Sequence, residues 1–385
     1  MVDNGISIPA ERVELDTVLL KVASRCNIDC KYCYVYHMGD NNWARIDKMM
    51  SYETMDAVSR SLGQLASTQT REFCVVLHGG EPLLLGKSKL RYLLNALRKT
   101  LPSSYPISLQ TNGILISQSI LDLCFEFRTT IAVSIDGPQH IHDIDRVDHR
   151  SEGTFERVLG GIKKLSSHRH SDFLYAGVLA VINPLSDPKE VYSFFKALDP
   201  PSVDFLYRDG NHSRLPPGKS SVHSTEYGSW MVGLLGVYLA DHDPTPIRII
   251  DDMLKVLLGG STSKEGTGIT DFGIIIIDTD GSIAKNDTLK SAARFADRFD
   301  ESWTVMNGSL LNLLGSEEMR IYHEAQKPSS PTCRMCPILN ICGGGMVTHR
   351  WDEKTGYSNP SVFCADQQLL IGRMKTVINQ HNLGP

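Results

Sequence analysis

Apolar residues along the first two thirds of the chain follow two alternating periods. Short runs rich in Val, Ile and Leu predict buried strands, and apolar residues spaced three and four apart predict amphipathic helices. The predicted strands are residues 18–23, 73–77, 107–110, 130–135, 174–182 and 203–206. The predicted helices between them are residues 52–66, 89–99, 116–125, 154–166 and 189–198.

Repeated strand–helix units predict a parallel sheet that helices cover. Six units form an incomplete version of the eight-unit barrel, so we expect an α/β fold with a partial (β/α)6 TIM-like barrel. Catalytic groups of such barrels gather at the C-terminal ends of the strands. Cys26, residues 79–81, Asn112 and Asp136 each follow a predicted strand closely, which predicts a site at this edge.

The remaining third of the chain has a different organisation. A connector rich in Gly, Pro, Ser and Arg precedes predicted helices, a predicted hairpin around Asp280-Gly281, and a final helix. We therefore expect three parts. They are a core domain over residues 1–208, a connecting helical region over 209–270, and a C-terminal cysteine-bearing domain with a final helix over 271–385.

Composition excludes several classes of partner. The chain has 385 residues, 41% hydrophobic and 22% charged, with a net charge of −5, which is ordinary for a globular protein. The chain has no surplus of basic residues, which would be the sign of a nucleic-acid partner. No apolar run is long enough to span a bilayer, and the first seventeen residues lack the apolar stretch of a signal peptide. We expect a cytoplasmic protein with no membrane partner.

Seven of the nine cysteines fall in two clusters. One is Cys26, Cys30 and Cys33, and the other is Cys333, Cys336, Cys342 and Cys364. In a reducing compartment, close clusters favour metal binding over disulfides. Cys74 and Cys124 stand alone in apolar surroundings and are expected to be small buried core residues.

The first cluster lies on a loop after a predicted strand. Three thiolates on a short loop can hold three irons of a cubane and leave the fourth without a protein ligand. An open coordination position is where a metal can do substrate chemistry. The alternatives are three structural cysteines, or a zinc site that uses His37 as its fourth ligand.

The spacing Cys26-x3-Cys30-x2-Cys33, with Tyr32 before the last cysteine, resembles the signature of the radical SAM superfamily. Companion features occur in the same order. Gly79-Gly80-Glu81-Pro82 resembles the segment that contacts the amino group of S-adenosylmethionine (SAM), with backbone carbonyls and Glu81 as acceptors. Further residues that the resemblance assigns to the SAM site are Gln110, Asn112, Ser134, Asp136 and Arg146, the last facing the SAM carboxylate.

The resemblance implies a [4Fe–4S] cluster whose open iron is chelated by SAM. One electron from the cluster, supplied by a donor such as a flavodoxin or ferredoxin, would cleave the sulfonium and produce a 5′-deoxyadenosyl radical. That radical would abstract a hydrogen atom from the substrate.

The second cluster supplies four thiolates, in the pattern Cys333-x2-Cys336-x5-Cys342-Gly-Gly-Gly followed by Cys364. Spacing alone leaves zinc and iron–sulfur open. The region resembles the SPASM extension of peptide-modifying radical SAM enzymes, which implies an auxiliary [4Fe–4S] cluster. Relatives with two auxiliary clusters have cysteines at places that match Asn286 and Met346 here. We therefore expect one auxiliary cluster, and two clusters in total.

The same resemblance suggests a catalytic base. In sulfatase-maturing relatives an Asp directly after the lost cysteine is a proposed proton acceptor, and Asp287 occupies the matching place. Asp280 is a second candidate, although Asp-Gly also favours a hairpin turn.

Three segments resemble one subgroup, the maturases that form cyclophanes in ribosomally made (RiPP) peptides: residues 203–206, His78, and residues 355–362. These enzymes join an aromatic side chain to the β-carbon of a nearby residue, so a precursor peptide is the expected partner. About 17 residues precede the first strand, too few for a separate recognition domain. The leader peptide would then bind to the core, to the middle helices or to another protein.

Other readings keep or change the enzyme class. A radical SAM enzyme could instead form a thioether or ether crosslink, epimerise a residue, or make formylglycine, although the lost cluster argues mildly against formylglycine. A non-enzymatic alternative is an iron–sulfur electron carrier or a zinc scaffold. Modification of tRNA or nucleotides is disfavoured by the acidic charge balance and the SPASM-like tail.

Overall fold

Eight strands form one sheet in the computed structural model, which describes residues 12–39, 41–270 and 272–380. Most of the N-terminal stretch considered for a signal peptide lies outside the described residues. The sheet order is β6-β5-β4-β3-β2-β1-β7-β8. The strands are β1 Thr17–Ala23, β2 Cys74–Gly79, β3 Ile107–Thr111, β4 Thr129–Ser134, β5 Tyr175–Val181, β6 Val203–Leu206, β7 Ile274–Ile277 and β8 Ile283–Ala284.

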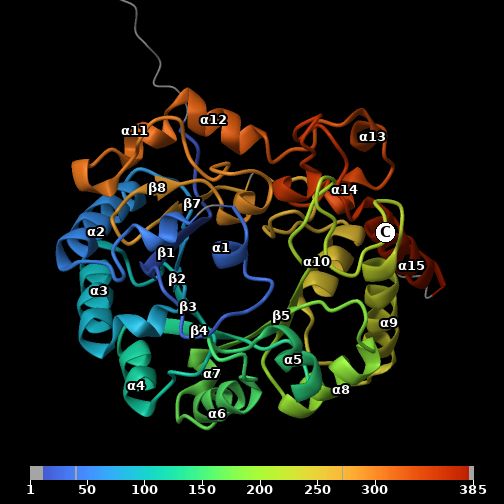
Figure 1. Ribbon diagram of the computed structural model, residues 1–385, viewed down its shortest axis with the longest axis horizontal. Helices are drawn as coiled ribbons and strands as arrows, with labels where there is room; N and C mark the ends of the chain where they lie inside the picture. The colour runs from blue at the N-terminus through green and yellow to red at the C-terminus, as the bar shows by residue number, and fades with distance from the viewer. Residues whose placement is uncertain (1–11, 40, 271, 381–385) are drawn as a thin grey trace, which may run out of the picture.

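The predicted α/β partial barrel is confirmed. The first six strands are parallel and occur in the sheet in sequence order, with helices between them. Figure 1 shows the strands curving around a central opening, with the connecting helices outside and α1 at the opening. The outer helices are α2 Tyr52–Ala66, α3 Lys87–Thr100, α4 Gln118–Glu126, α6 Phe155–Ser166 and α8 Pro188–Leu198.

Further helices follow the strands or build the C-terminal third. They are α1 Tyr34–His37, α5 Gln139–Asp145, α7 Ser171–Leu174, α9 Glu226–Ala240, α10 Arg248–Leu257, α11 Leu310–Leu314, α12 Glu317–Glu324, α13 Pro331–Arg334, α14 Leu339–Cys342 and α15 Cys364–Gln380. Short 3-10 helices are η1 Asn42–Ala44, η2 Pro82–Leu85, η3 Asp287–Ser291, η4 Val305–Asn307 and η5 Val347–Arg350.

The predicted Asp-Gly hairpin is β7–β8, and it joins the core sheet. β7 runs parallel to β1, from the pair Thr17 and Ile274 to the pair Leu20 and Ile277. All four isoleucines of β7 are buried, as a parallel strand covered on both faces requires. The sheet is therefore continuous across the boundary that we predicted between residues 270 and 271.

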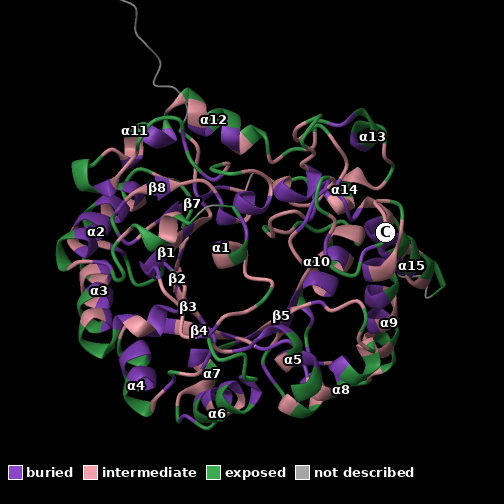
Figure 2. Ribbon diagram, viewed as in Figure 1, coloured by how far each residue is buried: buried purple, intermediate pink, exposed green. Residues whose placement is uncertain are grey.

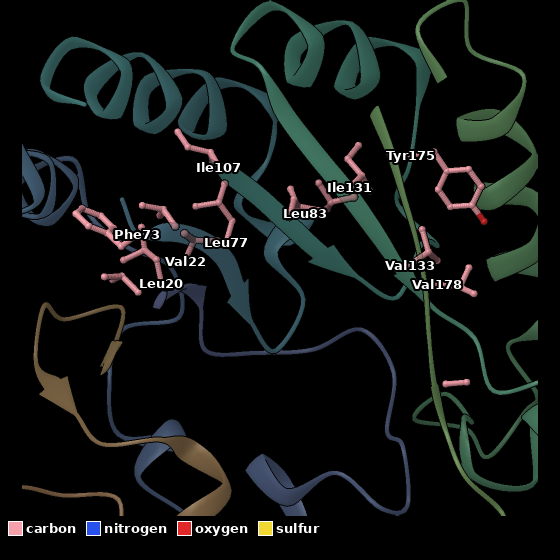
Figure 3. Packing of buried hydrophobic residues seen from close by; sticks show 14 of the residues in the cluster. Leu20, Val22, Phe73, Leu77, Leu83, Ile107, Ile131, Val133, Tyr175 and Val178 are labelled. Carbon is pink, nitrogen blue, oxygen red and sulfur yellow. The ribbon is translucent and has the colours of Figure 1, made fainter. Parts of the chain in front are cut away.

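The core lies between the sheet and its outer helices. Leu20 and Leu77 are opposite each other in the register and fully buried, and Figure 3 shows them beside Val22 and Phe73. The helix α2 begins at Ser51, whose Oγ accepts a hydrogen bond of 3.0 Å from the Thr54 N–H. Each buried aliphatic side chain contributes about 1.5–3 kcal/mol, so this layer holds the strand ends in place.

Two glycines at the end of β2 allow a close backbone approach. Gly79 has a φ of +141°, and a Cβ added there would lie 2.1 Å from the Ala23 carbonyl oxygen. A Cβ on Gly80 would lie 2.0 Å from the Tyr36 hydroxyl and 2.2 Å from the Arg25 carbonyl oxygen. Only glycine lets the end of β2 pack against the chain that follows β1, and that chain carries the first cysteines.

The C-terminal third is anchored to the connector by a buried ion pair. Lys219 Nζ lies 2.6 Å from Asp366 Oδ2, and both side chains are fully buried. In Figure 1 the helix α15 lies along α9. Figure 2 shows exposed residues along the outward faces of the peripheral helices. None of the helices in the described ranges combines the length and apolar character needed to cross a membrane.

Candidate functional site

The loop after β1 brings Cys26, Cys30 and Cys33 together. Burial raises the pKa of Cys26 and of Cys30 to about 12, and the nearby thiols add to the effect. Two side-chain donors face the sulfurs. Asn112 Nδ2 lies 3.8 Å from Cys26 Sγ, and Arg146 Nη1 lies 4.0 Å from Cys30 Sγ. Hydrogen bonds to sulfur are a feature that tunes iron–sulfur clusters.

His37, the fourth ligand in the zinc alternative, lies against a carboxylate of the same loop. His37 Nε2 lies 2.9 Å from Asp29 Oδ1, and both side chains are about 40% exposed. Across the described part of the chain, no group of three or more Cys, His, Asp or Glu side chains is arranged to hold a single metal ion. Three partly buried thiols with polar donors fit a larger cluster, which Cys26, Cys30 and Cys33 would hold.

Asp136, at the end of β4, is the centre of a second group of predicted residues. Its Oδ2 accepts a hydrogen bond of 2.6 Å from the Tyr32 hydroxyl, and its Oδ1 lies 3.1 Å from Arg146 Nε. The Arg146 and Arg208 guanidinium carbons lie 5.6 and 5.7 Å from the centre of the Tyr32 ring. The fold thus joins three predicted SAM contacts, Tyr32, Asp136 and Arg146, beside the cysteine loop.

Buried polar residues hold Asp136 and Arg146 in place. The Asp136 N–H donates to His142 Nδ1 at 3.3 Å, and His142 Nε2 lies 3.0 Å from Thr154 Oγ1. Thr154 Oγ1 donates in turn to the Arg146 carbonyl at 2.8 Å. Burial lowers the pKa of His142 to about 4, so the ring is neutral and can accept at Nδ1 while it donates at Nε2.

Glu81 is engaged by the protein itself. Its carboxylate is fully buried and accepts hydrogen bonds from the Leu83 N–H, the Thr111 hydroxyl and the Asn112 N–H at 3.0, 2.7 and 2.8 Å. These bonds tie the end of β2 to the end of β3. Its predicted role as an acceptor for the SAM ammonium stays a prediction.

The remaining predicted contacts lie at the same edge of the sheet. Gln110 Nε2 donates to Ser134 Oγ at 2.8 Å across β3 and β4. Asn112 Nδ2 also donates to Asn27 Oδ1 at 2.7 Å, which links the end of β3 to the cysteine loop. Pro82 begins η2 and is buried. The strand ends therefore collect the predicted residues, as expected for a partial barrel.

The four C-terminal cysteines line one pocket. Ile338, Leu339 and Gly344 are among its other lining residues. Arg350 is 2% exposed and donates to the carbonyls of Gly344 and Gly345, at 3.0 and 2.5 Å, and to those of Ala325 and Gln326. Four thiols around one mostly apolar pocket fit a fully ligated cluster, which Cys333, Cys336, Cys342 and Cys364 would hold.

The two places matched to lost cysteines come together around a carboxylate. Asn286 Nδ2 donates to both oxygens of Glu265, at 2.9 and 3.0 Å. Glu265 and Met346 line one pocket. Burial raises the pKa of Glu265 to about 7. Asn286 and Met346 supply no thiol there. The local chemistry is therefore that of the Glu265 carboxylate and the Asn286 amide.

The two candidate bases occupy different surroundings. Asp280 lies in the β7–β8 turn, where its Oδ1 accepts from the Ser282 N–H at 3.0 Å and from the Ser282 hydroxyl at 2.6 Å. Asp287 is 1% exposed, and its Oδ2 lies 2.6 Å from Lys21 Nζ. Lys21 also lies 3.5 Å from Asp278.

Sequence reasoning missed Lys21 and Asp278. A signal was present for Lys21, because it is a charged residue inside the apolar strand 18–23. Asp278 stands two residues before Asp280, and only the pairing of β7 with β1 shows which of the two faces the lysine.

Residues 20–193 match the family described as the Radical SAM superfamily. The chain is 23% identical, over 91% of its length and 92% of the relative's, to the cysteine-type anaerobic sulfatase-maturating enzyme of Clostridium novyi (strain NT).

Two solved structures share the fold. Native anSMEcpe with bound AdoMet and Cp18Cys peptide aligns with a TM-score of 0.77 at 21% identity, over 95% of this chain and 99% of that one. Streptococcus suis SuiB bound to precursor peptide SuiA aligns with a TM-score of 0.61 at 12% identity, over 91% and 76%. The segment that matches the Radical SAM superfamily, residues 20–193, contains the three-cysteine loop and the parallel strands from the end of β1 to β5, so the likeness covers the part of the chain that carries the first site.

Proposed function

We propose that this enzyme oxidatively modifies the β-carbon of a residue in a ribosomally made peptide, and that it joins this carbon to a nearby aromatic ring as a cyclophane. The observation that carries the proposal is Asp287, a buried carboxylate whose Oδ2 is paired with Lys21 at 2.6 Å. Attack of a carbon on an aromatic ring leaves a proton that must be removed to restore aromaticity. A carboxylate beside the strand ends is suited to accept it.

The cofactors of the proposal are two iron–sulfur clusters and SAM. A [4Fe–4S] cluster on Cys26, Cys30 and Cys33, with SAM, supplies a 5′-deoxyadenosyl radical when bound. Tyr32, Asp136 and Arg146 would orient SAM, and an auxiliary cluster on the four C-terminal cysteines of a SPASM-type extension would accept an electron. The carboxylate and amide at Glu265 and Asn286 support a single auxiliary cluster.

A second candidate is formylglycine formation, which also begins at a β-carbon. It is favoured by the likeness to anaerobic sulfatase-maturating enzymes over nine tenths of the chain. Both candidates need a proton acceptor, and Asp287 is the residue proposed for it. They differ in what happens to the substrate carbon, which becomes bonded to a ring in one case and becomes an aldehyde in the other.

The test uses the anaerobically reconstituted full chain with SAM and dithionite. It is offered a short precursor peptide encoded beside its gene and, separately, a sulfatase-derived peptide with Cys or Ser. We expect the precursor peptide to lose two hydrogens, to give no aldehyde adduct with a hydrazide, and to show a new ring–β-carbon bond in its NMR spectrum. An aldehyde in the sulfatase peptide, with no change in the precursor peptide, would establish the second candidate instead.

A further inference from the structure

Three neighbouring strands place charged side chains next to one another beside Asp287. Lys21 of β1 is opposite His78 of β2 in the parallel register. On the other side, Leu20 is opposite Ile277, so Asp278, the next residue, comes level with Lys21. Lys21 Nζ lies 2.6 Å from Asp287 Oδ2 and 3.5 Å from Asp278 Oδ2. The ammonium therefore sits between two carboxylates.

This cluster is almost completely removed from water. The side chains of Lys21 and Asp287 are 6% and 2% exposed. Burial by itself would lower the pKa of Lys21, but the charges of Asp287 and Asp278 raise it overall. Burial lowers the pKa of His78 to about 4, so this ring is neutral. Lys21 is thus the cation that offsets two adjacent carboxylates.

The two oxygens of Asp287 have different surroundings. Both oxygens are buried, and Oδ2 forms the ion pair with Lys21 Nζ at 2.6 Å; apart from that contact, neither oxygen has a hydrogen-bond partner among the described residues, so Oδ1 has none at all. A buried carboxylate oxygen without a partner is costly. An oxygen left open in this way is available to a group that arrives only with the substrate. The helix α1, which directly follows the first cysteines, packs against η3, the element that begins with Asp287.

We propose that Lys21 is a positioning residue that keeps Asp287 ionised and holds its Oδ2, so that Oδ1 receives a proton from the substrate. The inference rests on the proposed function, in which Asp287 is the proton acceptor. In this step the substrate bond to hydrogen breaks, its electron pair stays on the substrate, and an O–H bond forms at Oδ1. The step transfers a proton only, so it requires no oxidant of its own.

The physical reason is the repulsion between the carboxylates. Without Lys21, Asp278 and Asp287 would be two buried like charges beside each other, and this repulsion favours the uptake of a proton by the pair. A protonated Asp287 cannot accept a proton. The titratable groups that face Asp287 are Lys21 on β1, His78 on β2, Tyr34 on α1, Asp278 after β7 and Tyr322 on α12.

The test compares Lys21→Met with Lys21→Arg, which keeps the charge. For Lys21→Met we expect unchanged SAM binding, 5′-deoxyadenosine formation that is uncoupled from product, and about tenfold or more less modified peptide at pH 7. Product formation should recover as the pH rises, because Asp287 then loses its proton. Lys21→Arg should keep the profile of the native enzyme. Should Lys21→Met fail to fold, Lys21→Gln replaces it.

Lys219→Met is the matched control, because it breaks an equally buried Lys–Asp pair of 2.6 Å elsewhere in the fold. It should lower thermal stability and leave the pH profile of product formation where it is. If Lys219→Met shifts the profile as Lys21→Met does, the effect is general destabilisation and the inference is wrong.

A second readout needs neither clusters nor peptide. In the cluster-free protein at pH 7, infrared difference spectra between Lys21→Met and the native chain should show an additional protonated carboxyl in the variant, beyond those of native groups such as Glu265, and this signal should disappear when Asp287→Asn is added. Absence of that signal, together with an unshifted pH profile, would overturn the inference. If the signal appears but the native enzyme modifies no peptide, the proposed function fails while the pairing that fixes the charge of Asp287 stands.

Discussion

The two cysteine clusters differ in what surrounds the sulfur atoms. The first has three thiols on one loop, with the polar groups of Asn112 and Arg146 within 4.0 Å of two sulfurs and Asp136 beside them. The second has four thiols around a pocket whose other lining residues include Ile338 and Leu339. Their backbones also differ in origin, since the first loop follows a core strand, and the second group comes from two short helices, the turn between them and the start of the long helix α15.

The difference separates two chemical tasks. A cluster with one thiolate too few, placed among charged side chains, has room and electrostatic support for a charged ligand such as SAM. A cluster with a full set of thiolates in an apolar pocket has no open position, and is suited to moving electrons. The following predictions test this division, starting with the largest expected effect.

Replacing one cysteine in each cluster should give the largest effects, and the effects should differ between the two clusters. We expect Cys30→Ala to abolish 5′-deoxyadenosine formation, because the first cluster loses one of only three protein ligands. Cys342→Ala should retain SAM cleavage but lose modified peptide and about four irons per chain. Mass spectrometry of 5′-deoxyadenosine and an iron assay measure these effects.

Cys124→Ala serves as the control for both cysteine variants, because Cys124 is buried in the core away from either cluster. It should keep both activities. Full peptide modification by Cys30→Ala would contradict the radical mechanism altogether.

Removing the guanidinium of Arg146 should affect the first site alone. Arg146→Met leaves Asp136, which is 6% exposed, without its cation, and the SAM carboxylate loses its expected partner. We expect SAM to bind at least about tenfold more weakly, which corresponds to about 1.4 kcal/mol, while the iron content is unchanged. Anaerobic equilibrium dialysis measures the dissociation constant.

The surface pair of Arg157 and Asp148, 2.8 Å apart, provides the control for Arg146. Arg157→Met should change SAM affinity less than twofold, because exposed ion pairs contribute little. Unchanged SAM affinity in Arg146→Met would exclude this arginine from the SAM site.

Removing Arg350 should affect the second site alone. Arg350→Met leaves the carbonyls of Gly344 and Gly345 without their buried donor, which costs about 1–3 kcal/mol for each group. We expect a lower unfolding temperature and a partly iron-depleted second cluster, with SAM cleavage retained. Calorimetry and the iron assay measure both. Loss of SAM cleavage before any loss of iron would show that the two sites are not separate.

Local pattern was sufficient for most of the elements. The helix predicted over residues 52–66 is α2 with the same bounds, and the six core strands occur where apolar β-branched runs predicted them. Short helices such as α5 and α13 were not predicted, because four to seven residues are too few for a helical period to be visible. The joining of β7 to β1 was also missed, since parallel pairing leaves no mark on either strand's own sequence.

The sequence by itself determined the alternation of strands and helices, the two cysteine spacings, and the residues gathered at the strand ends, because these depend on periods and short intervals along the chain. Only the tertiary structure decided how those residues are used. The fold gives the Glu81 carboxylate three hydrogen-bond donors from the protein. It also places Lys21 against Asp278, 257 residues away. Such contacts arise because a parallel sheet brings distant strands side by side, so the partner of a buried charge is set by packing and not by its neighbours in sequence.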